Sequence, residues 1–284
     1  MYINYDLSII IAHYNSFDKL NVLLQSIPEN NSIEIIVVDD YSTNLSNDEL
    51  DSLSNNTRLI FLKNNQTKGA GVARNIGLNK ASRKYVLFAD SDDYFVKKNF
   101  QKAIVAGQKL NKDIVFFPPI SYVENTEMPT KKAKPFKTRV LKYIHKQSAK
   151  NENRLRTKFH VPWSKLYKRN YLIKNKILFQ NTIVSNDALF SLKSGLLAKN
   201  IGALDVVIYV YVSGEKSLTT IKDKHILQIR TDVYLDYIKY LKNNLPKKQM
   251  NYHRLLGLKY IYMGLKSGQS VLKSINILKK NKIK

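Results

Sequence analysis

Strands and helices are expected to alternate from residue 7 to residue 117. Short apolar runs rich in β-branched residues predict strands at 7–12, 34–38, 58–62, 85–88 and 113–117. Apolar residues at helical spacing predict helices between them, at 17–27, 48–53, 72–81 and 97–110. This alternation predicts an α/β fold with a mostly parallel, doubly wound, Rossmann-like sheet.

Polar residues follow three of these strands at the point where each strand ends. Tyr14 and Asn15 follow the first strand, Asp39 and Asp40 follow the second, and the stretch 90–93 follows the fourth. Because the carboxyl ends of parallel strands meet at one edge of a sheet, these groups are expected to lie together. The topology therefore favours a nucleotide-sized ligand along that edge.

The stretch 88–94, Phe-Ala-Asp-Ser-Asp-Asp-Tyr, joins an apolar strand to the three carboxylates of Asp90, Asp92 and Asp93. Clustered carboxylates repel one another unless a cation joins them. Oxygen ligands suit Mg²⁺ or Mn²⁺, and such an ion commonly holds the phosphates of a substrate. The structural alternative is a polar loop in which Asp92 or Asp93 caps the following helix.

Composition narrows the classes of protein. The chain has 284 residues, 44% of them hydrophobic, which is enough for one large core with a smaller appendage. It has no cysteine, which excludes disulfides and thiolate metal sites, and its five histidines lack zinc-ligand spacing. We see no signal peptide and no run of the ~18 apolar residues that a membrane span needs. A soluble cytoplasmic protein is therefore expected.

The net charge of +25 is concentrated in the second half of the chain. Residues 1–100 hold twelve acidic and ten basic residues, whereas 130–158 hold eleven basic residues and a single glutamate. Twelve basic residues and no acidic residue follow Asp236. This asymmetry favours an anionic partner, such as lipid headgroups, a phosphate-bearing substrate or nucleic acid. A lysine-rich surface that only keeps the protein soluble is the alternative.

The pattern changes after Pro118. The lysine-rich stretch 121–158 is expected to be a long excursion or a helix, and 201–212 one long strand or a strand pair. From residue 220 onward the pattern is helical, and packing of its apolar stripe on the protein is favoured up to residue 265. The basic amphipathic stretch 266–284 suits packing and a membrane interface equally well.

Six blocks in order carry a family resemblance. They are SIIIAHYN at 8–15, VVDDYST at 37–43, GAGVARNIG at 69–77, FADSDD at 88–93, WSKLYKR at 163–169 and NDALF at 186–190. Each block alone is weak, but together they resemble family-2 inverting glycosyltransferases with the GT-A fold, of the bacterial polysaccharide-assembly type. The resemblance implies a nucleotide-sugar-binding subdomain at 1–118 and an acceptor-binding subdomain at 119–219. It does not extend further, and the helical pattern and charge of 220–284 predict a basic helical extension there.

The resemblance implies roles for residues at the nucleotide end of the donor. Tyr14 stacks on the base, the backbone near Ala12 bonds to it, and Asp40 accepts a hydrogen bond from uracil N3–H. Asp39 supports the loop. The alternatives are a buried aromatic residue at a strand end and an aspartate that only forms a turn.

Other residues are implied at the sugar and diphosphate end. Gly69 lets the backbone approach the ligand, and Arg74 reaches the base or diphosphate as a permanent cation, unless it forms a surface ion pair. Asp90 contacts the ribose, and Asp92 is a ligand of Mn²⁺ or Mg²⁺, a task that Asp93 can share. The metal neutralises the diphosphate leaving group.

On the acceptor side, Asp187 resembles the family's general base, which takes the proton from the attacking hydroxyl. The alternative is a carboxylate favoured by a helix dipole. The family often has Glu-Asp here, whereas this chain has Asn186 before Asp187. Trp163 forms a wall for the acceptor sugar or belongs to the core. Relatives often carry an arginine after the tyrosine near 209–212, so diphosphate contacts at 214–219 are in doubt.

The implied function is transfer of a hexose or N-acetylhexosamine from a UDP-sugar to a sugar hydroxyl. The basic second half suggests a lipid-linked acceptor at the inner face of the cell membrane, as in bacterial capsule, O-antigen or wall polysaccharide assembly. The basic C-terminal helices would contact the membrane surface, and no nucleic-acid partner is expected. The alternatives are a basic RNA- or membrane-binding protein without catalysis and a nucleotidyltransferase that makes sugar nucleotides. Nucleotidyltransferases of that class carry a Gly-rich loop directly after the first strand, whereas this chain has His13, Tyr14 and Asn15 there.

Overall fold

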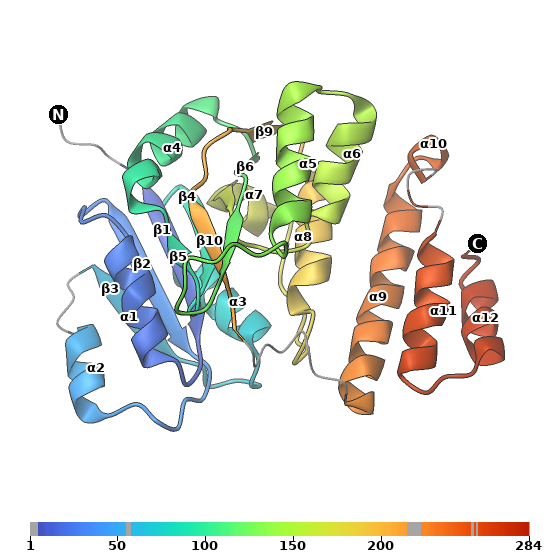
Figure 1. Ribbon diagram of the computed structural model, residues 1–284, viewed down its shortest axis with the longest axis horizontal. Coiled ribbons are helices and arrows are strands. Elements are labelled where there is room, and N and C mark those ends of the chain that lie inside the picture. Colours follow the sequence, from blue (N-terminus) through green and yellow to red (C-terminus); the bar gives the residue numbers. More distant parts are fainter. Residues whose placement is uncertain (1–4, 55–57, 215–222, 251–252, 254, 284) are drawn as a thin grey trace.

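A seven-stranded sheet forms the centre of the molecule (Figure 1). The structure, a computed structural model, describes residues 5–54, 58–214, 223–250, 253 and 255–283. The strands, in the order β3-β2-β1-β4-β8-β6-β9, are β1 (Leu7–His13), β2 (Ile33–Asp39), β3 (Leu59–Lys63), β4 (Tyr85–Asp90), β6 (Ile114–Phe116), β8 (Lys165–Lys168) and β9 (Ile201–Ala203). Only β8 runs antiparallel to its neighbours in this sheet. The predicted α/β fold with a mostly parallel sheet is confirmed.

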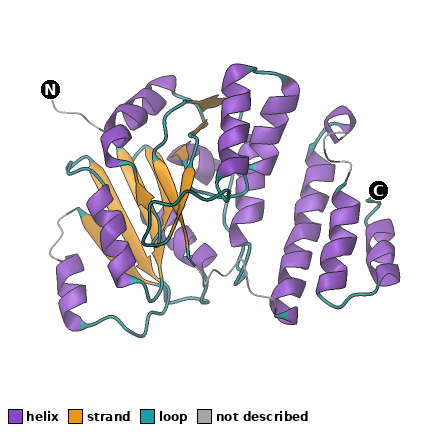
Figure 2. Ribbon diagram, in the orientation of Figure 1, coloured by secondary structure: helices purple, strands orange, loops and turns teal. Residues whose placement is uncertain are grey.

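Helices cover both faces of this sheet (Figure 2). One core contains α1 (Phe17–Ser26) and α4 (Lys97–Leu110), and the other contains α3 (Ala70–Lys80), α5 (Lys134–His145), α6 (Ala149–Lys158), α7 (Arg169–Lys174) and α8 (Asn186–Leu197). A further helix, α2 (Asn47–Ser54), precedes β3. Side chains alternate along a strand, so Ile9 joins the first core and Ile10 the second. Burial on both sides explains why these strands are continuous apolar runs.

A small second sheet supports the carboxyl edge of the first. Its order is β5-β10-β7, from β5 (Tyr94–Phe95), β7 (Ile120–Val123) and β10 (Tyr209–Ser213). The predicted segment 201–212 is therefore two strands in different sheets, because β9 pairs with β6 while β10 pairs with β5 and β7. Exposed Asp205 lies between these two strands. The division expected after residue 118 cuts through the large sheet, which β8 and β9 complete.

In the described part of the chain after residue 223, four helices lie at the right of Figure 1, and the first of them packs against α8. They are α9 (Lys224–Asn244), α10 (Lys247–Met250), α11 (Leu256–Lys266) and α12 (Val271–Lys280). Leu192 of α8 packs with Tyr237 and Leu241 of α9, and Ile238 of α9 packs with Tyr260 and Leu278 of the last two helices. The apolar stripe of α9 thus packs on the protein, as the sequence favoured.

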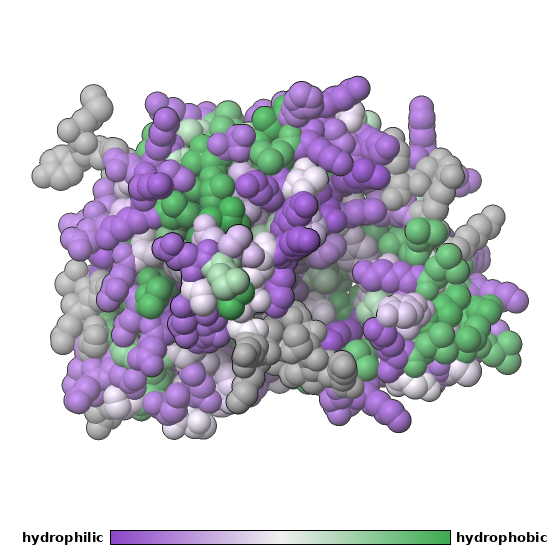
Figure 3. Space-filling view, viewed as in Figure 1, coloured by the Kyte–Doolittle hydropathy of each residue, from purple (hydrophilic) through white to green (hydrophobic). Residues whose placement is uncertain are grey.

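The apolar stripe of α11 faces outward instead. Leu258 and Tyr262 are 65% and 56% exposed, whereas Gly257, Tyr260 and Gly264 are buried. The small residues decide this orientation, because a Cβ at Gly264 would lie 2.5 Å from Ser274 Oγ of α12. Figure 3 shows apolar residues gathered over these C-terminal helices. Within the described ranges, no helix combines the length and apolar character needed to cross a membrane.

Candidate active site

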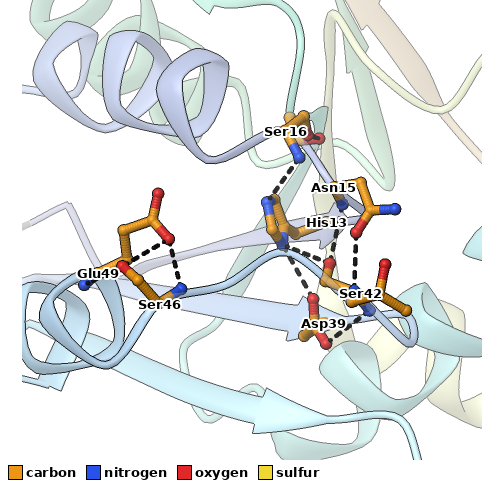
Figure 4. A network of polar contacts seen from close by, with 9 residues as sticks. His13, Asn15, Ser16, Asp39, Ser42, Ser46 and Glu49 are labelled. Carbon is orange, nitrogen blue, oxygen red and sulfur yellow. Dashed lines mark hydrogen bonds and ion pairs between the residues drawn. The ribbon is translucent and has the colours of Figure 1, made fainter.

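The loops that follow β1 and β2 are joined by a network of hydrogen bonds (Figure 4). Ser16 N–H donates to His13 Nε2 at 3.3 Å, so the ring carries its proton on Nδ1 and donates to Asp39 Oδ1 at 3.0 Å. Ser42 N–H donates to Asp39 Oδ2 at 3.1 Å, and Asn15 N–H donates to Ser42 Oγ at 2.8 Å. The position of Asp39 matches its expected role as a loop support, because both of its oxygens hold this network.

Tyr14 projects from this network and is 45% exposed. The ammonium of Lys68 lies 3.8 Å from the centre of its ring. Ala12, two residues earlier, aligns with Val38 of β2 and Asp90 of β4 at the carboxyl edge of the sheet. Tyr14 is therefore not the buried aromatic residue of the structural alternative, and it has surface on which a base can stack.

Asp40 is buried at the same edge and is held by one of its two oxygens. Its Oδ1 accepts hydrogen bonds from Asn64 Nδ2 at 2.8 Å and from Gly69 N–H at 2.9 Å. Within the described part of the chain, Oδ2 makes no hydrogen bond. Gly69 has a φ of 154°, a conformation that favours glycine. The backbone of Gly69 thus approaches Asp40, and one carboxylate oxygen remains for a ligand.

Arg74 on α3 connects the carboxyl edge of the large sheet to α8. Its Nη2 donates to Asp90 Oδ1 at 2.5 Å and its Nη1 donates to Asn186 Oδ1 at 2.9 Å. Burial disfavours the charge, but the carboxylates of Asp90 and Asp187 outweigh that effect and raise the pKa of Arg74. Arg74 is therefore a buried bridge rather than a surface ion pair.

Gly71 allows α3 to approach the start of α8. A Cβ at this position would lie 2.5 Å from the carbonyl oxygen of Gln180 and 2.8 Å from Cβ of Asn186. Both contacts are shorter than van der Waals contact permits, so any side chain here would push the two segments apart. Gly71 thus sets the distance between α3 and the start of α8. Its role is the close packing of these two segments rather than direct contact with a ligand.

Asp187 lies in the first turn of α8 and is half-buried. Burial raises the pKa of its carboxyl to about 6, and Asp90 adds to this effect, while Arg74 and Lys165 oppose it. Asp187 also lines a cleft of about 940 Å³ between α8 and the C-terminal helices. A carboxylate that titrates near neutral pH beside a cleft has the properties of a general base.

The three aspartates after β4 have different surroundings. Asp92 is exposed, but the surrounding protein limits its hydration and the Asp90 carboxylate repels its charge, which together raise its pKa to about 6. Asp93 is buried and accepts hydrogen bonds from Tyr209 Oη and Val212 N–H, both at 2.7 Å. The expectation that Asp93 shares a metal does not fit this arrangement, because both of its oxygens serve the small sheet.

Comparison with known proteins identifies the family. Residues 8–175, more than half of the chain, match the profile described as Glycosyl transferase family 2. The chain belongs to this family.

Family-2 relatives include bacterial enzymes of surface glycan synthesis. The chain is 38% identical over 117 residues to WfaP of Escherichia coli, a UDP-Glc:alpha-D-GlcNAc-diphosphoundecaprenol beta-1,3-glucosyltransferase, covering 40% of this chain and 45% of WfaP. It is 28% identical over 215 residues to TarS of Staphylococcus aureus strain MW2, a poly(ribitol-phosphate) beta-N-acetylglucosaminyltransferase, covering 72% of this chain and 35% of TarS. The chain therefore spans less than half the length of each of these relatives.

Solved structures of similar fold confirm the GT-A architecture. Residues 1–349 of S. aureus TarS in complex with UDP-GlcNAc superpose with a TM-score of 0.65 and 22% identity, covering 91% of this chain and 72% of that one. The mannosyltransferase PcManGT of Pyrobaculum calidifontis, in complex with GDP-Man and Mn²⁺, gives a TM-score of 0.59 and 12% identity, covering 97% and 75%.

Trp163 has a different position from the one expected in this family-2 chain. It is 3% exposed, and its ring stacks on Tyr209 with centroids 5.1 Å apart and planes 12° apart. Tyr209 Oη in turn accepts from Asp90 N–H at 3.0 Å, as well as donating to Asp93. An acceptor wall needs an open ring face, so the core alternative fits Trp163, which supports the acidic corner through Tyr209.

The fold brings most of the predicted residues to one edge of the sheet. Those at the ends of β1, β2 and β4 and on α3 meet there, and Arg74 links them to Asn186, the residue before Asp187 on α8. Sequence patterns did not predict a role at the site for Asn64, Lys68 or Tyr209. For Lys68 there was a signal, because it directly precedes Gly69. The doubtful contacts at 214–219 lie outside the described residues, except for Gly214.

Proposed function

We propose that this chain is an inverting glycosyltransferase that moves a hexose or N-acetylhexosamine from a UDP-sugar to a sugar hydroxyl. The acceptor belongs to a bacterial surface polysaccharide. The position of Asp187 carries this proposal: its half-buried carboxyl titrates near pH 6, interacts with the Arg74–Asp90 pair at the donor edge, and lines a large cleft. The activities of WfaP and TarS support the same class of reaction.

In this reaction Asp187 accepts the proton of the acceptor hydroxyl while the hydroxyl oxygen bonds to C1 of the donor sugar. The bond from C1 to the diphosphate oxygen breaks on the opposite face, so the configuration inverts and UDP leaves with the bonding electrons. A carboxyl with a pKa near 6 is ionised at neutral pH and is a stronger base than an ordinary aspartate. Arg74 positions α8 against the donor edge, which aligns base and donor.

Tyr14 and Asp40 recognise the uracil in this proposal. The exposed ring of Tyr14 stacks on the base, and the free Oδ2 of Asp40 accepts from N3–H. The backbone near Ala12 bonds to the base, and Asp90 contacts the ribose. Lys68, which lies over one face of Tyr14, is placed to pair with a phosphate or to close over the base.

A divalent cation fits the corner formed by Asp90 and Asp92. The mutual repulsion that helps to raise the pKa of Asp92 is relieved by a cation, and Arg74 occupies only Oδ1 of Asp90. Within the described residues no group of three or more acidic or histidine side chains could hold a metal. One or two carboxylates suffice, however, when substrate phosphates complete the coordination of Mg²⁺ or Mn²⁺. When bound, the ion neutralises charge on the leaving diphosphate.

The apolar outer face of α11 and α12 supports contact with a membrane. Leu258 and Leu272 are 65% and 70% exposed, and α12 carries lysines but no acidic residue. Anionic lipid attracts such a surface, and buried leucines would add to the affinity. We therefore place the enzyme at the inner face of the cell membrane, where lipid-linked acceptors are found.

Vesicle binding tests this membrane contact. The chain should sediment with vesicles of phosphatidylcholine and phosphatidylglycerol but not with phosphatidylcholine alone. A Leu258→Ser and Leu272→Ser double variant should remain in solution, whereas Leu110→Ser, which is 37% exposed on α4, should behave like the unmodified chain. Equal sedimentation of the unmodified chain, the double variant and the control would show that the apolar face of α11 and α12 does not bind the membrane.

A thermal-shift screen of UDP, GDP and dTDP sugars, with and without Mn²⁺, tests the function. UDP-sugars should raise the melting temperature, and more so with Mn²⁺, because a ligand that binds only the folded state stabilises it. Release of UDP from the stabilising donor then tests turnover. Nucleic-acid binding that falls steeply with salt, with no response to any sugar nucleotide, would favour the rival RNA-binding function instead.

A further inference from the structure

The cleft beside Asp187 separates the catalytic fold from the C-terminal helices. Its volume of about 940 Å³ lies at the upper end of the range for ligand pockets. Its walls are formed by residues of α5, α6, α8, α9 and α11 and of the segment before β8. They are Arg139, Lys158, His160, Val161, Ser185, Asp187, Ala188, Arg230, Val233, Tyr234, Tyr237, His253, Leu255, Leu256, Lys259 and Met263.

Among the charged residues of this lining, positive charge dominates. Four of the lining residues, Arg139, Lys158, Arg230 and Lys259, are permanent or near-permanent cations, and Asp187 is the one carboxylate among the described residues of the wall. Burial lowers the pKa of Arg139, Lys158 and Lys259, and for Lys158 the neighbouring cations contribute. Cations gathered at such a cost are stabilised when an anion binds among them.

Two buried nitrogen atoms of the lining residues have no hydrogen-bond partner within the described chain. They are Arg139 Nη1, a donor, and His253 Nδ1. Burial and the cations Lys158 and Arg154 lower the pKa of His253 to about 4, so the ring is neutral at physiological pH. Its Nε2 lies 3.0 Å from Asn153 Oδ1 and donates there, which leaves Nδ1 as an acceptor. Buried polar atoms usually have partners, so these two nitrogen atoms leave hydrogen-bonding capacity unused beside the cleft.

Apart from Arg230 and Lys259, the residues that α9 and α11 contribute to the cleft form an apolar and aromatic wall. It is formed by Val233, Tyr234 and Tyr237 of α9 with Leu256 and Met263 of α11. Tyr237 and Tyr234 stack on each other with ring centroids 6.0 Å apart. Such a wall accommodates the face of a sugar ring or a hydrocarbon chain, next to the cations that face a charged group.

We infer that this cleft is the acceptor site and that its acceptor carries a phosphate or diphosphate ester next to the sugar that reacts. The phosphate binds to Arg139 and Lys259, and a sugar hydroxyl donates to His253 while another reaches Asp187. This inference rests on the proposed function and names the chemistry of its acceptor. Two sources share that chemistry: a sugar on a polyprenyl diphosphate, and a polyol-phosphate chain.

Binding of small phosphate esters tests the inference, with UDP at saturating concentration so that the donor site is filled. The probes are geranyl diphosphate for the lipid source and ribitol 5-phosphate for the polyol source, each against its phosphate-free alcohol. The variant is Arg139→Gln with Lys259→Gln. The matched control is Lys146→Gln with Lys266→Gln, which removes two exposed cations after α5 and on α11, outside the cleft.

At least one phosphate ester should bind more tightly than its alcohol, and the tighter of the two identifies the source. The cleft variant should weaken this binding by about tenfold or more, since it removes charge-assisted hydrogen bonds, while the control stays within about twofold. If the double variant does not fold, Lys259→Gln alone serves the comparison.

The UDP measurement distinguishes a failure of the acceptor inference from a failure of the proposed function. If UDP binds normally but neither ester binds, or if the cleft variant and the control bind the esters equally, the acceptor inference is wrong and the glycosyltransferase proposal stands. If UDP itself fails to bind the unmodified chain, the proposed function is wrong.

Discussion

Replacing Asp187 by asparagine should give a more stable protein that no longer transfers sugar. The folded protein raises the pKa of this carboxyl from 3.8 to about 6, so the ionised form is less favourable in the folded state than in the unfolded state. The resulting loss of stability is absent below about pH 4, grows as the pH rises through 4 to 6, and is complete above that range. Asparagine has a similar shape but carries no charge, so it avoids this loss of stability.

The size of the effect follows from the pKa shift. A shift from 3.8 to about 6 corresponds to at most about 3 kcal/mol of folding free energy. Solvent reaches the half-buried carboxyl, so we expect roughly 1–2 kcal/mol for Asp187→Asn at pH 7.5. For a chain of this size that is a rise in melting temperature of about 2–6 °C. The difference between the two proteins should vanish near pH 4.

Activity should change in the opposite direction. Loss of a general base typically lowers the rate by ~10²–10⁴, and binding of UDP should be unchanged because the donor edge is intact. In the unmodified enzyme, UDP release should fall as the pH drops through about 6 and be roughly tenfold below its plateau at pH 5. Asp205→Asn, which neutralises an exposed carboxylate away from the site, is the control for both assays.

Two results would refute this reasoning. An Asp187→Asn protein that releases UDP at the normal rate would show that Asp187 is not the base. A protein that is inactive and also melts at a lower temperature than the unmodified chain at pH 7.5 would show that the carboxylate stabilises α8, as the helix-dipole alternative holds.

Three further predictions concern the surroundings of the base. Arg74→Gln removes a cation that lowers the pKa of Asp187, so the acid limb of UDP release should move to higher pH; a limb that stays near pH 6 would contradict this coupling. Gly71→Ala should push α3 away from Gln180 and the start of α8 and slow sugar transfer by up to ~10², with UDP affinity retained, and normal transfer would show that this spacing is unimportant. Asp92→Asn should abolish the extra stabilisation that Mn²⁺ gives with UDP in the thermal-shift assay, and persistence of that increment would place the ion elsewhere.

Local pattern was sufficient for the elements and for the donor edge. The boundaries of α1 and α4 match the sequence prediction within one residue, because apolar periodicity reports which face of a segment is buried. Tyr14, Asp40 and Asp90 meet at one edge because parallel strands share their direction. The expectations for Trp163 and for α11 failed for a common reason: an apolar or aromatic residue fits a core and a binding surface equally well in sequence, and only the neighbouring elements decide between them.

The sequence by itself therefore determined a mostly parallel sheet with carboxylates after the ends of its strands, since strand–helix alternation and residue type can be read locally. The tertiary structure decided what each carboxylate does. Arg74 reaches Asn186 across 112 positions of sequence, Asp93 is bound by the small sheet, and the cationic cleft exists only where the C-terminal helices meet α8. Burial and neighbouring charge set the chemistry of these groups, and both depend on segments that the chain brings together only when it folds.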